Sequence, residues 1–310
     1  MSETIRKIYD LILKRVLELS PRAVVGFING LYDESMPVNN SEVIYTATES
    51  ISDDLGYTFS DKMLTIRSGD ILRRFHIEAE ITSNDDEIAL RIFDYGYKDV
   101  LRNKKIKDGL IALSFPQPKI IYLEHWSTAP DEVTLELDFW GQGTSKYTVP
   151  TMKFLDYSIE ELEKRNMVIL LPLYLLKLRR KIETAKEKGA AGQYTDELKA
   201  LLKNDILETL TKSVNAGKIT HRDTHTLLSL LGRLYNHLYG EIKEFQDEKV
   251  KDMIDEKLLL ETDVLVAETM ESAAKGMLLE GMDVAAIERA TKLPRERILK
   301  IRESMAVVSA

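Results

Sequence analysis

Three of the carboxylate residues between positions 57 and 95 of the sequence, Asp61, Glu78 and Glu80, are placed so that they could converge. Glu78 and Glu80 are two positions apart in a segment of alternating apolar and polar residues, so on a β-strand both side chains lie on one face. Asp61 lies in the alternating segment before it. Carboxylates that converge from paired strands repel each other unless a cation neutralises them. The spacing therefore points to a cation site, while the plainer alternative is a row of solvent-facing carboxylates on an exposed sheet face.

A β-hairpin followed by a helix is the local structure that would position these carboxylates. Residues 57–66 and 71–81 alternate on either side of Ser68, Gly69 and Asp70, which favour a turn. Residues 86–101 follow with an apolar stripe at helical spacing. We also predict helices over 3–19 and 23–31 and strands over 111–113, 119–124, 133–140 and 147–154, the last at a sheet edge. This order predicts an α/β core with a mixed sheet flanked by helices.

The pattern changes to helical periodicity after residue 157. We therefore predict an α/β core over residues 1–157 and an all-helical region over 158–310. Residues 276–304 have the pattern of a helix-turn-helix, because Gly281 ends one helix, Asp283 caps the next and Pro294 precedes a third. Its basic residues are compatible with phosphate contacts. The interspersed Glu residues favour, slightly, a packing or dimerisation module, and hence a homodimer through the helical region.

The chain has 310 residues, a formal net charge of −8 and no cysteine. The acidic balance argues against a protein that coats nucleic acid generally, though not against a local basic groove. Disulfides, thiolate metal sites and cysteine nucleophiles are excluded. The start of the chain lacks the apolar run of a signal peptide, and residues 167–178, the most apolar stretch, contain Pro172 and Lys177 and fall short of the ~20 residues that span a bilayer. We expect a cytoplasmic protein with no membrane partner.

The ordered set of polar residues resembles a known nuclease superfamily. Asp61 on one strand, Glu78-Ala79-Glu80 on the next, and Arg91 and Tyr95 one helical turn apart resemble the PD-(D/E)XK nucleases. The set is most similar to the recombination-promoting nuclease / putative transposase branch, which carries E-x-Q on the second strand. Further segments resemble that branch in the same order, namely residues 27–31, Thr48-Glu49, residues 170–179 and residues 280–293. The resemblance covers most of the chain.

This resemblance implies a restriction-endonuclease-like core and a DNA endonuclease that depends on Mg²⁺ or Mn²⁺ and is linked to recombination or mobile elements. Phosphodiester hydrolysis needs an activated water and a neutralised leaving oxygen, and bound Mg²⁺ serves both needs. Mg²⁺ prefers oxygen ligands. The implied catalytic residues are Asp61, Glu78 and Glu80. The implied metal ligands are Asp61, Glu78, the backbone carbonyl of Ala79 and, as a further candidate, Glu49.

Glu80 departs from the pattern of these relatives. The superfamily normally has Lys at this position, and the branch mostly has Gln. A Lys would orient the attacking water and steady the phosphate charge, whereas a Glu can ligate a metal or accept a proton but supplies no positive charge. The alternative to an active enzyme is therefore a nuclease-fold protein that has lost catalysis and serves as a DNA-binding or assembly module.

Positively charged residues near the carboxylates are expected to meet DNA. Arg91 and Tyr95 share one helix face and could reach a phosphate beside the metal; the alternative is a surface Arg packed over a partly buried Tyr. A basic cluster follows, formed by Lys98, Arg102, Lys104, Lys105 and Lys107. It is expected either to bind the DNA backbone or to be a solvated helix end.

Two further features are expected to be structural. His221 and His225 have metal-ligand spacing on a helix, but apart from the intervening Asp223 no third ligand completes a set. Trp126 and Trp140 flank the late strands and are expected in the core or at its rim rather than as platforms for bases.

Overall fold

The protein is described by a computed structural model over residues 3–45, 49–51, 57–59, 62–81, 87–124 and 128–308. The chain divides into two compact units, Met1–Lys251 and Asp252–Ala310. The first unit contains every described strand together with helices α1 to α9, and the second contains helices α10 to α12.

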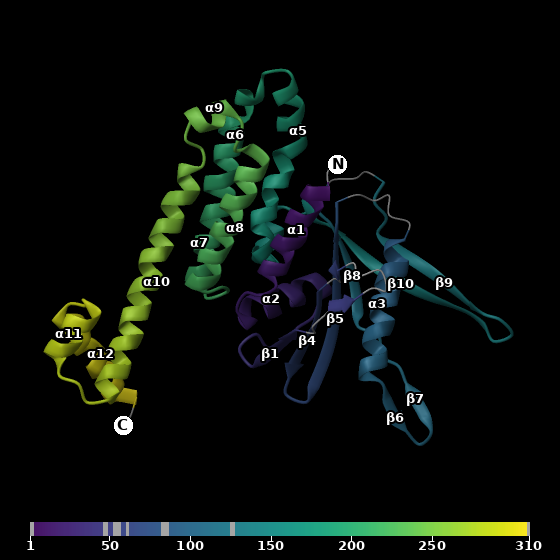
Figure 1. Cartoon of the computed structure of the whole chain (residues 1–310), viewed down its shortest axis with the longest axis horizontal. Helices are drawn as coiled ribbons and strands as arrows, with labels where there is room; N and C mark the ends of the chain where they lie inside the picture. The colour runs from purple at the N-terminus through teal and green to yellow at the C-terminus, as the bar shows by residue number, and fades with distance from the viewer. Residues whose placement is uncertain are drawn as a thin grey trace. The chain divides into compact units, whose positions relative to one another are not determined.

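Six strands form a mixed sheet in the first unit, in the order β1-β4-β5-β8-β10-β9 (Figure 1). Their bounds are β1 (Ser41–Tyr45), β4 (Lys62–Ser68), β5 (Ile71–Glu80), β8 (Gln117–Tyr122), β9 (Glu132–Phe139) and β10 (Gly143–Lys153). β8 runs parallel to both of its neighbours, β5 and β10, and the other pairs are antiparallel. The predicted mixed sheet is confirmed.

One strand prediction is wrong in its place in the sheet. Residues 147–154 were expected to form an edge strand, but β10 lies between β8 and β9. The reason is its length: residues 143–150 pair with β9, and residues 151–153 continue past β9 and pair with β8. The edge is β9 instead.

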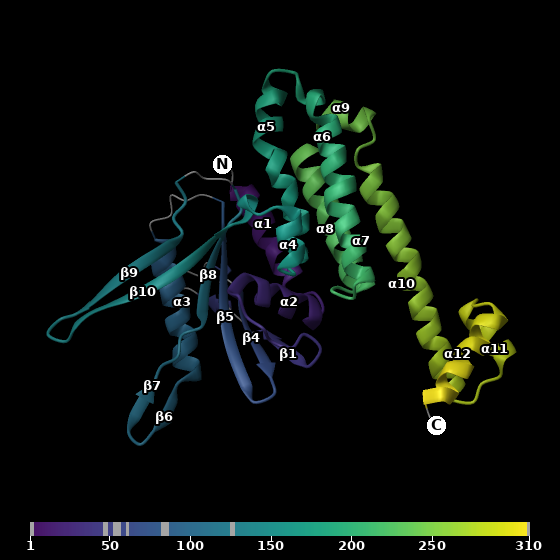
Figure 2. The ribbon, with the colours of Figure 1, turned by 180° about the vertical axis from the view of Figure 1, so that it is seen from behind.

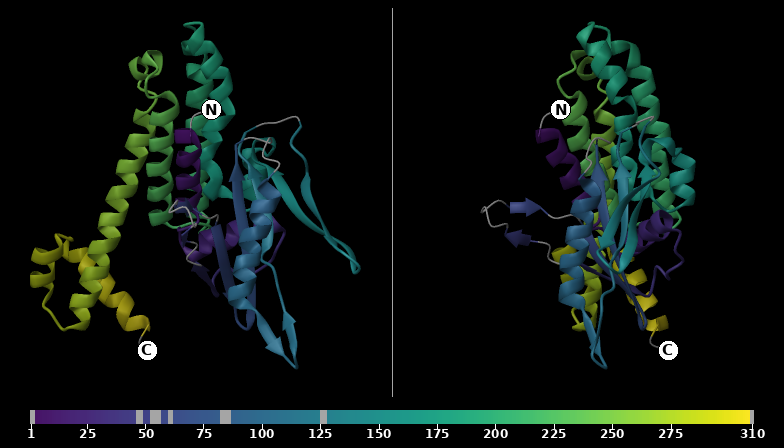
Figure 3. Two further views of the ribbon diagram at one scale, coloured as in Figure 1. Left: turned by 45° about the vertical axis from the view of Figure 1, so that its right-hand side comes forward. Right: turned by 90° about the vertical axis from the view of Figure 1, so that its right-hand side faces the viewer.

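Helices cover both faces of this sheet (Figures 1 and 3). α1 (Glu3–Val16) and α2 (Pro21–Tyr32) lie on one face, and α3 (Ile88–Asn103) lies on the other. Adjacent residues of β5 illustrate the two sides. Phe75 packs against Tyr32 of α2 with ring centroids 4.8 Å apart, and His76 faces Tyr95 of α3 at 6.2 Å. Since β5 and β8 are parallel, α3 is the crossover helix that joins them.

Two small hairpins lie outside the main sheet. β2 (Glu49–Ile51) pairs with β3 (Tyr57–Phe59), and β6 (Lys105–Lys107) pairs with β7 (Leu110–Ala112). The single strand expected over 57–66 is therefore two strands in different sheets, β3 and β4. The helix expected over 86–101 is shifted by two residues.

The remaining helices of the first unit belong to the same compact unit as the sheet. They are α4 (Ile159–Lys164), α5 (Leu176–Glu187), α6 (Thr195–Ala200), α7 (Glu208–Asn215), α8 (His221–Tyr239) and α9 (Lys243–Asp247), with the short helices η1 (Phe154–Asp156), η2 (Val168–Leu175), η3 (Ala191–Tyr194) and η4 (Leu201–Leu207). η2 is buried throughout and contacts α1, α2 and α8. The predicted boundary at residue 157 marks the end of the strands, whereas the compact unit extends to Lys251.

A glycine in α2 shows how closely these elements approach. A Cβ atom on Gly30 would lie 1.8 Å from the carbonyl oxygen of Arg165, which follows α4. Only glycine allows this approach of two backbones. The face of α2 away from the sheet is thereby held against the helical part of the same unit.

The second unit is a three-helix arrangement of α10 (Asp252–Leu279), α11 (Val284–Thr291) and α12 (Arg295–Val308). Its core contains Ala274, Ile287, Ile298 and Ile301. The side chain of Asp283 accepts a hydrogen bond from the backbone N–H of Ala286 at 2.9 Å, and so caps α11 as predicted. Residues 241–281 have the periodicity of one helix, but the structure divides them into α9 and α10. None of the described helices is long and apolar enough to cross a membrane.

Candidate functional site

Two of the predicted site carboxylates lie buried on the central strand β5. Glu78 and Glu80 are 4% and 3% exposed. In the pairing of β5 with β8, Glu78 lies opposite Ile120 and Glu80 lies opposite Tyr122. Ile120 and Tyr122 pack with Ile88 and Ile92 of α3. The two carboxylates therefore lie between the sheet and α3, and the alternative of a solvent-facing row is wrong.

Arg91 of α3 brings the two carboxylates together. Its Nη2 atom donates hydrogen bonds to Oε1 of Glu78 at 2.7 Å and to Oε1 of Glu80 at 2.6 Å. Hydrogen bonds between ionised groups of opposite charge are short and strong. The carboxylates thus converge as the sequence predicts, and among the described residues the positive charge beside them comes from a guanidinium.

These contacts belong to a ladder of polar pairs between β5 and α3. From one end to the other, Arg74 of β5 pairs with Asp99 of α3, His76 faces Tyr95, and Glu78 and Glu80 meet Arg91. Two residues along a strand advance about 6.6 Å, and four residues along a helix advance about 6 Å. The two periods nearly match, so alternate residues of β5 meet successive turns of α3, which runs in the opposite direction.

Tyr95 lies in the middle of this ladder and is largely buried. One face of its ring is covered by Lys98, whose Nζ atom lies 5.6 Å from the ring centroid. Lys98 also pairs with Asp94 at 2.8 Å. Tyr95 is therefore one helical turn from Arg91 on the same side of α3, as predicted, and is packed against His76 of the strand.

The remaining predicted metal ligands are less fully defined. Asp61 lies outside the described residues, and so does the side chain of Glu49, whose backbone is in β2. Ala79 lies between the two buried carboxylates, opposite Ile121 of β8. Within the described part of the chain, no group of three His, Cys, Asp or Glu side chains has the geometry of a metal site.

The predicted basic cluster does not join the carboxylates. Arg102, Lys104 and Lys105 are exposed and lie at the end of α3 and the start of β6. Eleven residues of helix separate Arg91 from Arg102, which corresponds to about 16 Å. Any ligand that meets both groups must extend over at least that distance.

A second buried ionic cluster was not predicted from the sequence. Glu124 follows the end of β8, and its carboxylate accepts hydrogen bonds from Arg179 and, at 2.8 Å, from Arg180 of α5. Arg179 also donates to the hydroxyl of Tyr9 in α1 at 3.3 Å. Burial raises the pKa of Tyr9 to about 12. The cluster ties the carboxyl end of β8 to two helices, and the backbone N–H of Leu123 joins it to Glu80 through a 2.8 Å bond to the Glu80 carbonyl.

Asp223, which lies between His221 and His225, serves as a helix cap rather than as a third metal ligand. Its carboxylate accepts hydrogen bonds from the backbone N–H of Thr220 at 2.9 Å and from the Ser20 hydroxyl at 2.6 Å. It therefore caps α8 and fixes the residue before α2.

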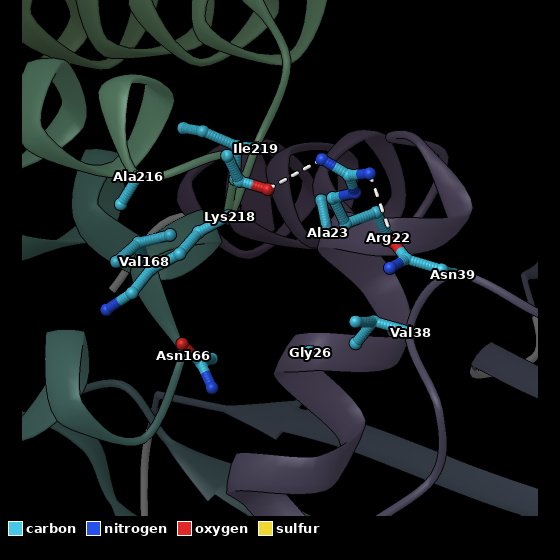
Figure 4. Close-up of a pocket in the computed structure, with 11 residues that line it drawn as sticks. Arg22, Ala23, Gly26, Val38, Asn39, Asn166, Val168, Ala216, Lys218 and Ile219 are labelled. Carbon is cyan, nitrogen blue, oxygen red and sulfur yellow. Dashed lines mark hydrogen bonds between the residues drawn. The ribbon is translucent and has the colours of Figure 1, made fainter.

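A cavity of about 380 Å³ lies elsewhere in the first unit (Figure 4). It is lined by Arg22, Ala23, Gly26, Val38, Asn39, Asn166, Val168, Ala216, Gly217, Lys218 and Ile219. Its two cations are engaged: Arg22 donates to the Gly217 carbonyl at 2.8 Å, and Lys218 donates to the Glu163 carbonyl at 3.0 Å. No lining residue belongs to β5 or α3, so the cavity is separate from the carboxylate pair.

This chain was compared with known proteins, and no family model, no curated protein and no solved structure matches it. The case for a functional site therefore depends on the residues themselves, above all on the convergence of Glu78 and Glu80.

Proposed function

We propose that this protein is a metal-dependent DNA endonuclease of the PD-(D/E)XK type. The observation that carries the proposal is the convergence of Glu78 and Glu80 at the carboxyl end of β5, where one nitrogen of Arg91 contacts both. In open α/β sheets, ligands bind outside the carboxyl ends of the parallel strands. The mixed sheet and the crossover helix that carries Arg91 and Tyr95 are compatible with the fold that the sequence resemblance implies.

The charges at this position fit a divalent cation. Two buried carboxylates share the guanidinium of Arg91, and carboxylates held this close together favour a further cation. Carboxylate oxygens are the ligands that Mg²⁺ and Mn²⁺ prefer. The proposed ligands are Asp61, Glu78 and the backbone carbonyl of Ala79, with Glu49 as a further candidate. When bound, the ion would make a water nucleophilic and neutralise charge on the phosphate.

The protein residues have separate proposed roles. Arg91 releases its carboxylates to the metal and donates to a DNA phosphate, for which its fork of N–H groups is suited. Glu80 accepts the proton of the attacking water, since a carboxylate can serve as a base but not as a source of positive charge. Tyr95, next to Arg91 on the helix, orients the same phosphate through its hydroxyl.

A second candidate function follows from the Arg91 contact. Arg91 already offsets part of the charge of the carboxylates, and Glu80 stands where the family that the sequence resembles has Lys or Gln. A protein in which this contact is permanent would keep the fold without catalysis and serve as a DNA-binding or assembly module.

Nicking of supercoiled plasmid DNA in Mg²⁺ or Mn²⁺ tests the proposal. We expect cleavage by the wild type and a loss of at least about 10²-fold in Asp61→Ala and in Glu78→Ala, since each removes a group that acts on the reacting atoms. Asp94→Asn is the matched control, because this exposed carboxylate on α3 forms an ion pair with Lys98 and not with Arg91. It should retain wild-type cleavage.

The outcomes separate the two candidates. Persistent cleavage in both Asp61→Ala and Glu78→Ala would contradict the assignment of the site. Binding of DNA without cleavage by the wild type would favour the inactive module.

A further inference from the structure

The β6–β7 hairpin exposes apolar side chains to an unusual degree. Ile106, Leu110 and Ile111 are 67%, 70% and 56% exposed. Ile106 and Ile111 are directly opposite each other in the antiparallel register, so they form one apolar face. Asp108 and Gly109, with φ values of 51° and 78°, form the tight turn between the strands. Exposed apolar groups gathered on so small an element mark an interaction site.

Positive charge lies at the base of this apolar face, while Asp108 stands at the turn. Arg102, Lys104 and Lys105 are exposed at the base of the hairpin, and no carboxylate among the described residues forms an ion pair with them. The nearest carboxylate along the helix, Asp99, is buried and already paired with Arg74. In a chain with a net charge of −8, this local excess of positive charge complements a polyanion.

We propose that the β6–β7 hairpin is an arm that binds duplex DNA through its minor groove. Arg102, Lys104 and Lys105 contact phosphates, the face formed by Ile106 and Ile111 wedges at a base step, and Leu110 on the opposite face packs against sugars. Apolar wedges flanked by basic residues are the usual means by which proteins open a minor groove. The inference rests on the proposed function for its choice of a DNA duplex.

The helix α3 fixes where this arm meets the duplex. Arg91 and Arg102 are about 16 Å apart along the helix axis, and successive base pairs are about 3.4 Å apart. If the phosphate that is cleaved lies at Arg91, the arm contacts the DNA about five base pairs away. A second protruding hairpin, β9–β10, offers a control in the same unit (Figure 2).

Fluorescence anisotropy with a labelled duplex tests the arm in the full-length protein. EDTA prevents cleavage, and titrations at NaCl concentrations between 50 and 200 mM, the range over which phosphate contacts weaken strongly, give the salt dependence. Lys104→Ala/Lys105→Ala should lower the slope of log K against log[salt] by about 2, since each lost phosphate contact removes about 0.9. Lys146→Ala, an exposed cation on β10, should leave the slope unchanged.

The apolar face is tested by Ile106→Ser/Ile111→Ser. We expect at least about tenfold weaker binding at every salt concentration, with an unchanged slope, because no charge is removed. A 2-aminopurine five base pairs from the cleaved position should brighten on binding of the wild type and not of this variant, because wedging unstacks the base. Trp140→Ser, which removes a fully exposed apolar side chain from the β9–β10 turn, is the matched control.

If both hairpin variants bind DNA with the affinity and the salt dependence of the wild type, the proposed DNA-binding arm is wrong, even if the protein cleaves DNA. Binding of vesicles with anionic phospholipid through Ile106 and Ile111, without binding of DNA, would also overturn it. Conversely, DNA binding that depends on the hairpin would support the arm even if no cleavage is found, in which case only the proposed endonuclease fails.

Discussion

The two ends of the polar ladder between β5 and α3 have opposite charge arrangements. At one end, the cation Arg74 is on the strand and the carboxylate Asp99 is on the helix. At the other end, the carboxylates Glu78 and Glu80 are on the strand and the cation Arg91 is on the helix. The first end is balanced, one charge against one, and Asp99 also accepts a 3.0 Å hydrogen bond from Asn103.

The difference teaches what each end is suited to do. A buried pair with balanced charges and satisfied hydrogen bonds holds two elements together and has no capacity for a further ion. Two buried carboxylates held close together repel each other, and a cation reduces this repulsion. The Arg74–Asp99 end therefore fixes α3 on the sheet, and the Glu78–Glu80 end is the one that we propose as reactive.

The largest expected effect comes from Arg91→Ala. In EDTA this change should lower the free energy of unfolding by about 3–5 kcal/mol, because it removes the guanidinium from two buried carboxylates. Mn²⁺ at one hundred times its dissociation constant should restore about 2.7 kcal/mol, as expected for a ligand that binds only the folded state. Urea unfolding with and without Mn²⁺ measures both values. Absence of any Mn²⁺-dependent recovery would contradict a cation site at this end.

Asp99→Ala should have a somewhat smaller effect. It leaves Arg74 without its carboxylate, but Arg74 is partly exposed and water replaces some of the lost interaction. We expect a loss of about 2–3 kcal/mol in urea unfolding, and no recovery with Mn²⁺. Asp94→Ala, an exposed carboxylate on the same helix, should change stability by less than about 0.5 kcal/mol. Recovery of Asp99→Ala by Mn²⁺ would remove the distinction between the two ends.

The smallest expected effect concerns Tyr147, which packs on the same face of the sheet. Its ring lies 5.2 Å from that of Phe93 in α3, but its buried hydroxyl has no hydrogen-bond partner among the described residues. Tyr147→Phe should therefore stabilise the protein by about 1 kcal/mol at neutral pH. An equal or lower stability of Tyr147→Phe would indicate that the Tyr147 hydroxyl forms a hydrogen bond in the folded protein and that its burial costs no free energy.

The same residue gives a prediction at alkaline pH. Burial raises the pKa of Tyr147 from 10.0 to about 12. The folded state favours the neutral phenol, whereas the unfolded chain loses the phenol proton near pH 10. The free energy of unfolding that depends on the neutral phenol is therefore fully present below pH 10 and is lost as the pH rises through about 12. Urea unfolding between pH 10 and 12 should show a smaller decline for Tyr147→Phe than for the wild type. Parallel declines would contradict the raised pKa.

Much of the local structure was predictable because it depends on residues close in sequence. The alternation in β5 correctly placed Glu78 and Glu80 on one face, and the four-residue spacing placed Arg91 and Tyr95 on one side of α3. The pairing of Arg91 with the carboxylates was not predicted, because the sequence does not reveal how far α3 is shifted along β5.

Long-range contacts were the least predictable. Glu124 and Arg179 are separated by 55 residues, and neither belongs to a motif with a fixed spacing. Of the β6–β7 hairpin, only the second strand was predicted, at 111–113, and β6 was missed because three residues are too few for alternation to be distinguished from a loop. The place of β10 in the sheet was not predicted either, because its pairing with β8 beyond the end of β9 depends on tertiary packing.

Binding of Mn²⁺ to the full-length protein without DNA tests the central claim most directly. Electron paramagnetic resonance of free Mn²⁺ would compare the wild type with Glu78→Gln and with Asp99→Asn. We predict binding by the wild type and by Asp99→Asn, and at least about tenfold weaker binding, or 1.4 kcal/mol, by Glu78→Gln. Equal binding by all three proteins, or none by the wild type, would contradict the assignment of the Glu78–Glu80 end as the cation site.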